Sequence, residues 1–402
     1  MKKFFTLAIV LLPLISIYAS GIRGFSLGDV LLIVLLIVSV FTKKDILSAK
    51  SREKNFYLFM FVLSIFFITL VSIGIHTDVD LYDVLIRIIR RTFYYLFIVF
   101  VSTHFFDYSL GQSYIFSIGK YSAVFLVFQY IFYFLFGFIL LGFIPFIPIY
   151  HEIYSELDYQ NLYENMFRPS SFFLEPAHFA RFLIIPLIFF VFEYKSKWDI
   201  VWGVILSIVI LLSTSGIGVL LFVLVCFFVL LNKSSKKKYS FIKGVLYLLP
   251  FIITFLVLRD SLAKESIDRV LNSDLSETNT AGGARFRGYY QFLELSSLDK
   301  IIGMGYGAVP DTELVTWFSG AGYLLYGVGI LGFLICMFLF YKTFLLSDSV
   351  TQKYLCIVFF FLLFVDDNFM SNLSILFFSF IFAERKQDTT ETISPQNVMV
   401  TS

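Results

Sequence analysis

The sequence predicts an all-α polytopic integral membrane protein with about twelve transmembrane helices. Of its 402 residues, 58% are hydrophobic and 15% are charged, whereas a soluble domain carries roughly 25% charged residues. Apolar runs of about 17–25 residues, the length that crosses roughly 30 Å of hydrocarbon, recur from one end of the chain to the other. We therefore expect one transmembrane domain over residues 1–402.

Each expected span coincides with one apolar run. In chain order they cover about residues 4–20, 26–41, 56–75, 84–106, 121–144, 177–194, 199–214, 216–231, 241–258, 317–341, 354–368 and 370–383. The first run also resembles a signal peptide, but we favour a retained helix because further spans follow it directly. Residues 213–218 predict a tight hairpin or a helix break, and the last two spans are short enough to form a re-entrant hairpin.

Lysine and arginine in the short loops determine the expected orientation. Residues 42–55 and 232–243 carry five positive charges each, and the twelve-span topology puts them on the same side as both ends of the chain. Both termini are therefore expected to be cytoplasmic. Two long loops, 145–176 and 259–316, then lie outside, and the larger one precedes the tenth span.

Arginine and lysine are distributed unequally between the two expected sides. The cytoplasmic side holds 17 Lys and 2 Arg, whereas the outer side holds 2 Lys and 10 Arg. Membrane topology accounts for the cytoplasmic lysines but gives no reason for outer arginines. Because arginine grips phosphate and carboxylate groups in a bidentate manner, we expect the outer face to bind an anion.

The stretch RPSSFFLEPAHFAR, residues 168–181, places four ionisable side chains at the start of the sixth span. Glu175 and Pro176 are suited to the first turn of a helix, where the carboxylate can cap free amides. His178 and Arg181 then share one helix face. Interfacial snorkelling would account for Glu175, but charge inside a span is costly and commonly functional. We therefore expect a functional cluster that also includes Arg168.

The fourth span opens with three arginines at helical spacing. Arg87, Arg90 and Arg91 stand at i, i+3 and i+4, so they form a positive stripe at its outer end. An interfacial anchor, with Tyr94 and Tyr95 in an aromatic belt, is the alternative interpretation. We favour phosphate binding, because outer arginines oppose the usual charge bias of membrane proteins.

The large outer loop combines paired arginines with a glycine motif. Arg285 and Arg287 are expected to contact a second phosphate or an acidic sugar near the membrane surface. Gly303, Gly305 and Gly307 follow a predicted helix but no strand, so a dinucleotide site is disfavoured. We expect these glycines to form a tight turn that leads back into the span at 317.

The remaining candidate residues are interpreted structurally. Asp366 and Asp367 are expected to be turn residues of the last hairpin rather than intramembrane carboxylates. The cysteines, Cys226, Cys336 and Cys356, lie in apolar runs without metal-ligand spacing, so we interpret them as small buried hydrophobic residues. We expect no metal site and no cofactor.

The segment RPSSFFLEPAHFA, residues 168–180, resembles the Wzy-type polymerases of O-antigen and capsular polysaccharide. Members of that family carry Arg, then Gly or Ser and Phe, then Glu-Pro at the start of a helix after an outer loop. Other matching features are the twelve expected spans, the break at 213–216 and the late outer loop that ends in IIGMGYG. The Arg-x10-Gly pattern of some members is absent from this sequence, which leaves the detailed assignment of the loops open.

The resemblance implies a metal-independent membrane glycosyltransferase in the bacterial inner membrane. Its substrates would be undecaprenyl-diphosphate-linked oligosaccharides, and its other partners would be membrane lipids and a polysaccharide chain-length regulator, with no nucleic acid. An acceptor hydroxyl would attack an anomeric carbon, with Glu175 or His178 as general base. The expected phosphate ligands are Arg168, Arg181, Arg285 and Arg287, and the expected ligands of the second lipid carrier are Arg87, Arg90 and Arg91.

The sequence leaves three other functions open. An O-antigen ligase has the same layout but transfers the glycan to a lipid A-core sugar. A flippase or other carrier would place its charged residues near the middle of the bilayer, along a passage. A structural or signalling protein gives no reason for ten outer arginines.

Overall fold

The structure, a computed structural model, is helical throughout its described part. It describes residues 1–22, 25–44, 46–76, 81–144, 146–150, 167, 169–193, 196–231, 281–307, 318–366 and 371–385. Extended pairing within these residues is limited to two isolated β-bridges, Tyr18–Ile149 and Ala19–Ser26. The expected all-helical architecture is therefore confirmed for the described residues.

The helices follow one another in chain order with short connections in most places. They are α1 (Lys2–Ile15), α2 (Leu27–Val40), α3 (Ala49–Ile75), α4 (Leu81–Phe97), the π-helix η1 (Ile98–Ser102), α5 (Thr103–Phe105), α6 (Tyr108–Phe136), α8 (Pro176–Phe192), α9 (Lys197–Leu212), α10 (Gly216–Leu231), α13 (Ala281–Glu294), α14 (Ser297–Ile302), α15 (Gly320–Leu346), α16 (Val350–Val365) and α17 (Asn372–Phe382).

These helices overlap the spans expected from the sequence, but α6 covers Tyr108–Phe136, whereas residues 121–144 were expected. Eleven of the twelve expected ranges overlap a described helix, and the twelfth, 241–258, lies outside the described residues. By length and composition, α3, α6 and α15 are long and apolar enough to cross a membrane, and α2, α8, α10, α16 and α17 are shorter apolar helices. The structure thus supports a membrane-embedded protein, and the number of spans stays a prediction.

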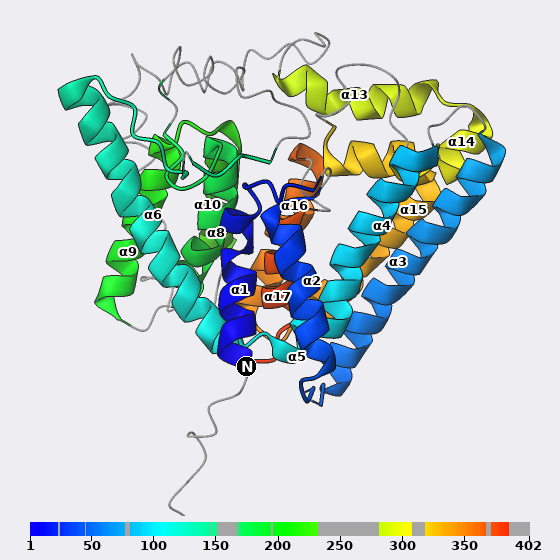
Figure 1. The fold of residues 1–402 in the computed structure, drawn as a ribbon, viewed down its shortest axis with the longest axis horizontal. Coiled ribbons are helices and arrows are strands. Elements are labelled where there is room, and N and C mark those ends of the chain that lie inside the picture. Colours follow the sequence, from blue (N-terminus) through cyan, green and yellow to red (C-terminus); the bar gives the residue numbers. More distant parts are fainter. Residues whose placement is uncertain are drawn as a thin grey trace, which may run out of the picture.

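The helices form three groups side by side (Figure 1). Helices α6, α8, α9 and α10 lie on one side, α3, α4 and α15 on the other, and α1, α2, α16 and α17 between them. Helices α13 and α14 lie across the end opposite the amino terminus. We call this the α13 end; under the predicted topology it is the outer end.

Helix α8 is one of the most deeply buried elements, although it carries the charged cluster predicted from the sequence. Fourteen of its seventeen residues are buried, and it contacts α6, α9, α10 and α16. A helix that is apolar on all sides is suited to such a central position. The charged residues of its first turns are therefore placed inside the protein rather than on a lipid-facing surface.

The carboxyl end of α17 is closed by side chains from two other helices. Lys54 of α3 donates its ammonium to the carbonyl of Ile381, and Ser51 donates to Phe382. From α16, Gln352 donates to the carbonyl of Ala383. The last carbonyls of a helix have no partner within the helix, so these side chains replace the water that a buried helix end lacks.

Helix α15 is broken at Gly329, whose φ of 64° and ψ of −170° are not helical. The break releases carbonyls that would otherwise accept hydrogen bonds within the helix. Met304 donates its backbone N–H to the carbonyl of Tyr326 at 2.9 Å, and Gly305 donates to Gly327 at 2.8 Å. The chain after α14 therefore donates hydrogen bonds to the backbone carbonyls that the break leaves free, as non-helical backbone inside a membrane protein requires.

Gly303, Gly305 and Gly307 form the turn that fits into this break, and all three have positive φ. A Cβ atom at position 303 would lie 2.4 Å from the carbonyl carbon of Gly327, which is backbone and cannot move aside cheaply. Helix α3 holds the turn through a hydrogen bond from Tyr306 N–H to Thr69 Oγ1. The sequence-based interpretation of these glycines as a tight turn is confirmed.

Replacing Gly303 by alanine is expected to destabilise the fold. It combines an unfavourable positive φ with a backbone clash, so we expect the free energy of unfolding to fall by about 2 kcal/mol or more. Denaturant titration of the purified protein in micelles measures this change. Gly137→Ala is the matched control, because Gly137 has positive φ but open space around its Cβ position. An equal loss of unfolding free energy in the two variants would contradict the proposed fit of the glycine turn into the break of α15.

Candidate functional site

The charged cluster of α8 begins at its amino terminus, where Glu175 is the N-cap residue and Pro176 the first helical residue. The backbone carbonyl of Glu175 accepts the first helical hydrogen bond from Phe179. Its carboxylate makes no capping hydrogen bond, so the expectation that it caps free amides is wrong. The carboxylate of this half-buried residue is therefore left for another role.

Arg181 and Asp366 form a buried ion pair between α8 and the end of α16. Only 2% of Arg181 and 4% of Asp366 are exposed. Arg181 donates through Nη1 to Oδ2 of Asp366 and through Nε to the carbonyl of Ala177. His178, one turn earlier on α8, lies within electrostatic range of both charges. Arg181 is therefore neutralised by a carboxylate inside the protein.

Asp366 also connects α8 to the elements at the α13 end. Its backbone carbonyl accepts a hydrogen bond from Gly320 N–H at 2.6 Å, at the first turn of α15. The preceding residue, Ser319, caps α15 and donates its hydroxyl to Tyr289 of α13 at 3.1 Å. The start of α8, the end of α16, the start of α15 and α13 thus meet in one region.

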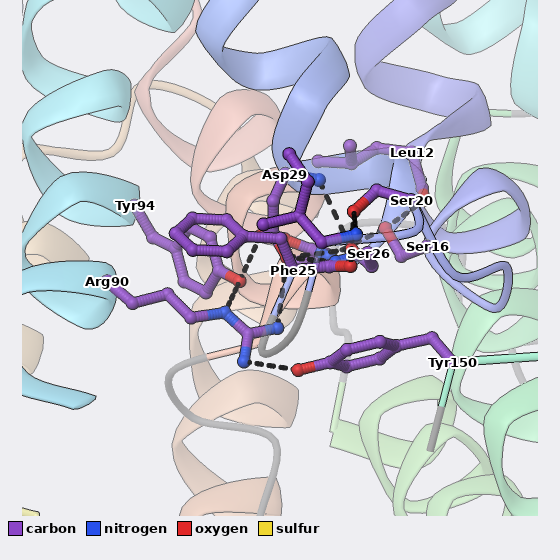
Figure 2. A network of polar contacts seen from close by, with 11 residues as sticks. Leu12, Ser16, Ser20, Phe25, Ser26, Asp29, Arg90, Tyr94 and Tyr150 are labelled. Carbon is purple, nitrogen blue, oxygen red and sulfur yellow. Dashed lines mark hydrogen bonds and ion pairs between the residues drawn. The ribbon is translucent and has the colours of Figure 1, made fainter. Parts of the chain in front are cut away.

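A second ion pair, with a buried carboxylate and a partly buried guanidinium, holds Arg90 of α4 (Figure 2). Arg90 donates to Asp29 Oδ2 at 3.0 Å, to Tyr94 Oη at 2.8 Å and to Tyr150 Oη at 2.8 Å. Asp29 also accepts hydrogen bonds from Tyr94 and from the backbone and hydroxyl of Ser26. This network joins α2, α4 and the segment after α6, so Arg90 has a structural role.

The neighbouring tyrosines do not form the aromatic belt that was the alternative interpretation of this stretch. Tyr94 is 3% exposed and Tyr95 is completely buried, so neither ring reaches a lipid headgroup. Arg87 of the same stripe donates to the carbonyl of Gly307 at 3.3 Å. One function of the stripe is therefore to hold the glycine turn.

Arg91 stands over two tyrosine rings at the α13 end. Its guanidinium carbon lies 4.9 Å from the ring centre of Tyr306 and 4.4 Å from that of Tyr323. Such cation–π contacts stabilise a charge away from water. A cavity of about 10 Å³ lies beside Arg91, large enough for about one water molecule.

Helix α13 and the start of α15 meet at what we call the α13–α15 junction. Gly288 lies against Gly322, because a Cβ atom at either position would contact the backbone of the other. The residues next to this contact carry buried polar atoms. Among the described residues, Arg287 Nη1, Gln291 Oε1 and Tyr323 Oη have no hydrogen-bond partner.

The structure thus separates the predicted site residues into groups. Glu175, His178 and Arg181 lie on α8 and are connected through Asp366 to the region of Arg287. The arginines of α4, in contrast, contact α2, the glycine turn and the tyrosines. Arg168 lies outside the described residues, and Arg285 lies in α13 where only the backbone is described.

Four residues of this region were missed or misjudged from the sequence. The sequence predicts Asp366 to be a turn residue, and it indicates no role for Asp29, Gln291 or Tyr323. Asp367, for which the same role is predicted, lies outside the described residues. A signal existed for Asp29, since it is a single carboxylate beside a long apolar run and such a charge requires a partner. Gln291 and Tyr323 gave no comparable signal, because both residue types are common in amphipathic helices.

Within the described residues, no group of three or more His, Cys, Asp or Glu side chains has an arrangement that could hold a metal ion. Comparison with protein-family models and with curated proteins gives no match. A function for this chain is therefore inferred from its own geometry and from the motif in residues 168–180.

Removing one partner of the Arg181–Asp366 pair is expected to leave a buried, uncompensated charge. We expect Asp366→Asn and Arg181→Met each to lower the free energy of unfolding by about 3–5 kcal/mol, and the double variant to lose clearly less than their sum. A double-mutant cycle with denaturant titration measures the coupling. Lys50→Ala, which removes the exposed Lys50–Asp348 pair, should change stability by less than about 1 kcal/mol. Strict additivity of the two buried variants would contradict the pairing.

Proposed function

We propose that this protein is a membrane glycosyltransferase that joins lipid-diphosphate-linked oligosaccharides at the outer face of the membrane. In the terms of the family it resembles, it is a polymerase of undecaprenyl-diphosphate-linked repeat units. One observation carries the proposal. A carboxylate and an imidazole at the start of α8 are connected through Asp366 to arginine- and tyrosine-rich elements at the same end of the molecule.

The proposed reaction needs a base for the acceptor and positive charge for the leaving group. The acceptor hydroxyl oxygen bonds to the anomeric carbon, the bond from that carbon to the diphosphate oxygen breaks, and the hydroxyl proton moves to the base. Glu175 is the favoured base, because its carboxylate is not occupied in capping. His178, one turn further along α8, is the alternative.

The arginines have different roles in this proposal. Arg287 and Arg91 neutralise the departing lipid diphosphate, since α13 packs against α15 and Arg91 lies over Tyr323 of the same helix. Arg181 is paired with Asp366 and positions the first turns of α8, so it serves the reaction indirectly. Arg90, paired with Asp29, plays no part in phosphate binding, which revises the expectation for that residue.

The position of these groups favours an enzyme over a carrier. A carrier binds its substrate near the middle of the bilayer, commonly between internal repeats. Here Glu175 and His178 lie at the start of α8, and Arg91 reaches the ring of Tyr323 close to the start of α15. This arrangement suits a reaction at the membrane surface, on a head group whose lipid tail remains in the bilayer.

Gene deletion with complementation tests the proposal. Wild type is expected to restore a ladder of surface glycan on a gel, whereas Glu175→Gln and Arg287→Ala should give single repeats. Loss of general-base catalysis reduces the rate by about 100-fold or more. Arg385→Ala is the matched control. Arg385 lies after α17 and pairs with Glu193 at the carboxyl end of α8, away from Glu175 at the start of that helix, so this variant should retain the ladder. All variants must be compared at equal protein level.

Two outcomes would contradict the proposed polymerase. A deletion strain that keeps its ladder would exclude this chain from the polymerisation step. A deletion strain that lacks all attached glycan, including the single repeat, would indicate a ligase instead.

A further inference from the structure

The three polar atoms at the α13–α15 junction reduce the stability of the fold, because they are buried without hydrogen bonds. A buried donor or acceptor without a partner costs about 1–3 kcal/mol. Arg287 Nη1, Gln291 Oε1 and Tyr323 Oη are all buried and lack a hydrogen-bond partner among the described residues. Gly288 and Gly322, which contact each other, are direct sequence neighbours of Arg287 and Tyr323. Gln291 follows Gly288 by three residues in α13, so it lies on the same face of that helix. Three such costs at one helix contact call for a ligand that removes them.

The chemistry of the three atoms restricts what that ligand is. The guanidinium of Arg287 only donates hydrogen bonds, the amide oxygen of Gln291 only accepts them, and the hydroxyl of Tyr323 does both. A diphosphate diester has acceptor oxygens but no donor, so it leaves Gln291 Oε1 unsatisfied. A sugar offers hydroxyls that donate and accept, and it therefore satisfies all three atoms.

We propose that the α13–α15 junction is a carbohydrate subsite, which holds a sugar of the lipid-linked substrate through Arg287, Gln291 and Tyr323. This inference rests on the proposed function, because it assigns the sugar part of the same substrate. Arg91, which lies over the ring of Tyr323, places the diphosphate next to this sugar.

The subsite requires a movement of α13. The backbones of Gly288 and Gly322 lie against each other, so the closed junction leaves no room for a sugar between the two helices at this contact. Helix α13 is held on α15 by the glycine contact and by the hydrogen bond between Ser319 and Tyr289. The closed junction leaves three polar atoms without hydrogen bonds. Separation of α13 from α15 would let these atoms form hydrogen bonds, first to water and then to a bound sugar, so a sugar favours the separated state.

Substitutions in the subsite are expected to have opposite effects on stability and on binding. Gln291→Leu and Tyr323→Phe remove an unsatisfied polar atom, so the unfolding temperature of the empty protein should stay equal or rise. Both variants should weaken the binding of an undecaprenyl-diphosphate-linked oligosaccharide by about tenfold, the loss of roughly one hydrogen bond to a buried group. Binding of undecaprenyl diphosphate without sugar should stay within about twofold of wild type.

The experiment uses the full chain in lipid nanodiscs, with both lipids titrated and thermal unfolding measured on the same samples. Thr343→Val is the matched control, because Thr343 Oγ1 is also buried without a partner in the described part of the chain but belongs to the last turns of α15. This variant should alter neither affinity.

The possible results separate the two proposals. If wild type prefers the glycosylated lipid and both variants retain that preference, the subsite is wrong and the proposed function stands. The subsite is also wrong if both variants lower the unfolding temperature of the empty protein. The two side chains would then stabilise the fold, and weaker binding would follow from the loss of stability. If wild type binds neither lipid, the proposed function fails and the subsite fails with it.

Discussion

The buried ion pair between Arg181 and Asp366 is the interaction on which the candidate site depends. It fixes the first turns of α8 to the end of α16, and through the carbonyl of Asp366 it reaches the start of α15. A charge in a low-dielectric interior is tolerated only with a partner, so neither residue is replaceable alone. The pair thereby determines where Glu175 and His178 stand relative to α13, although neither Arg181 nor Asp366 takes part in the proposed proton transfer.

The need to satisfy polar groups away from water also shapes the rest of the fold. The break of α15 at Gly329 is tolerated because the glycine turn supplies N–H donors to the freed carbonyls. Asp29 serves Arg90, Tyr94 and Ser26 at once, and the end of α17 is closed by Lys54 and its neighbours. Buried polar atoms without a hydrogen-bond partner also occur elsewhere in the described residues, for example at Asn55 and Thr343. Three of them, however, belong to α13 and the start of α15, and a ligand there is the explanation we favour.

The sequence predicted the helices well because apolar length is a local property. The apolar runs predicted α2, α8 and α10 to within a few residues, and the closely spaced glycines predicted the turn after α14, where the structure gives them positive φ. The partners of the arginines were not predictable in this way. Asp366 lies 185 residues from Arg181 and Asp29 lies 61 residues from Arg90, and no periodic pattern connects such positions. The number of charges was visible in the sequence, but which of them neutralise each other depends on tertiary packing.

The central claim is that this chain lengthens lipid-linked glycans, and an assay with purified protein tests it most directly. The protein is reconstituted into liposomes with an undecaprenyl-diphosphate-linked repeat unit, and the lipid-linked products are analysed by mass spectrometry. We predict products that grow by whole repeat units, with release of undecaprenyl diphosphate, and no growth with Glu175→Gln. Movement of the lipid-linked unit across the bilayer without any lengthening would contradict this claim.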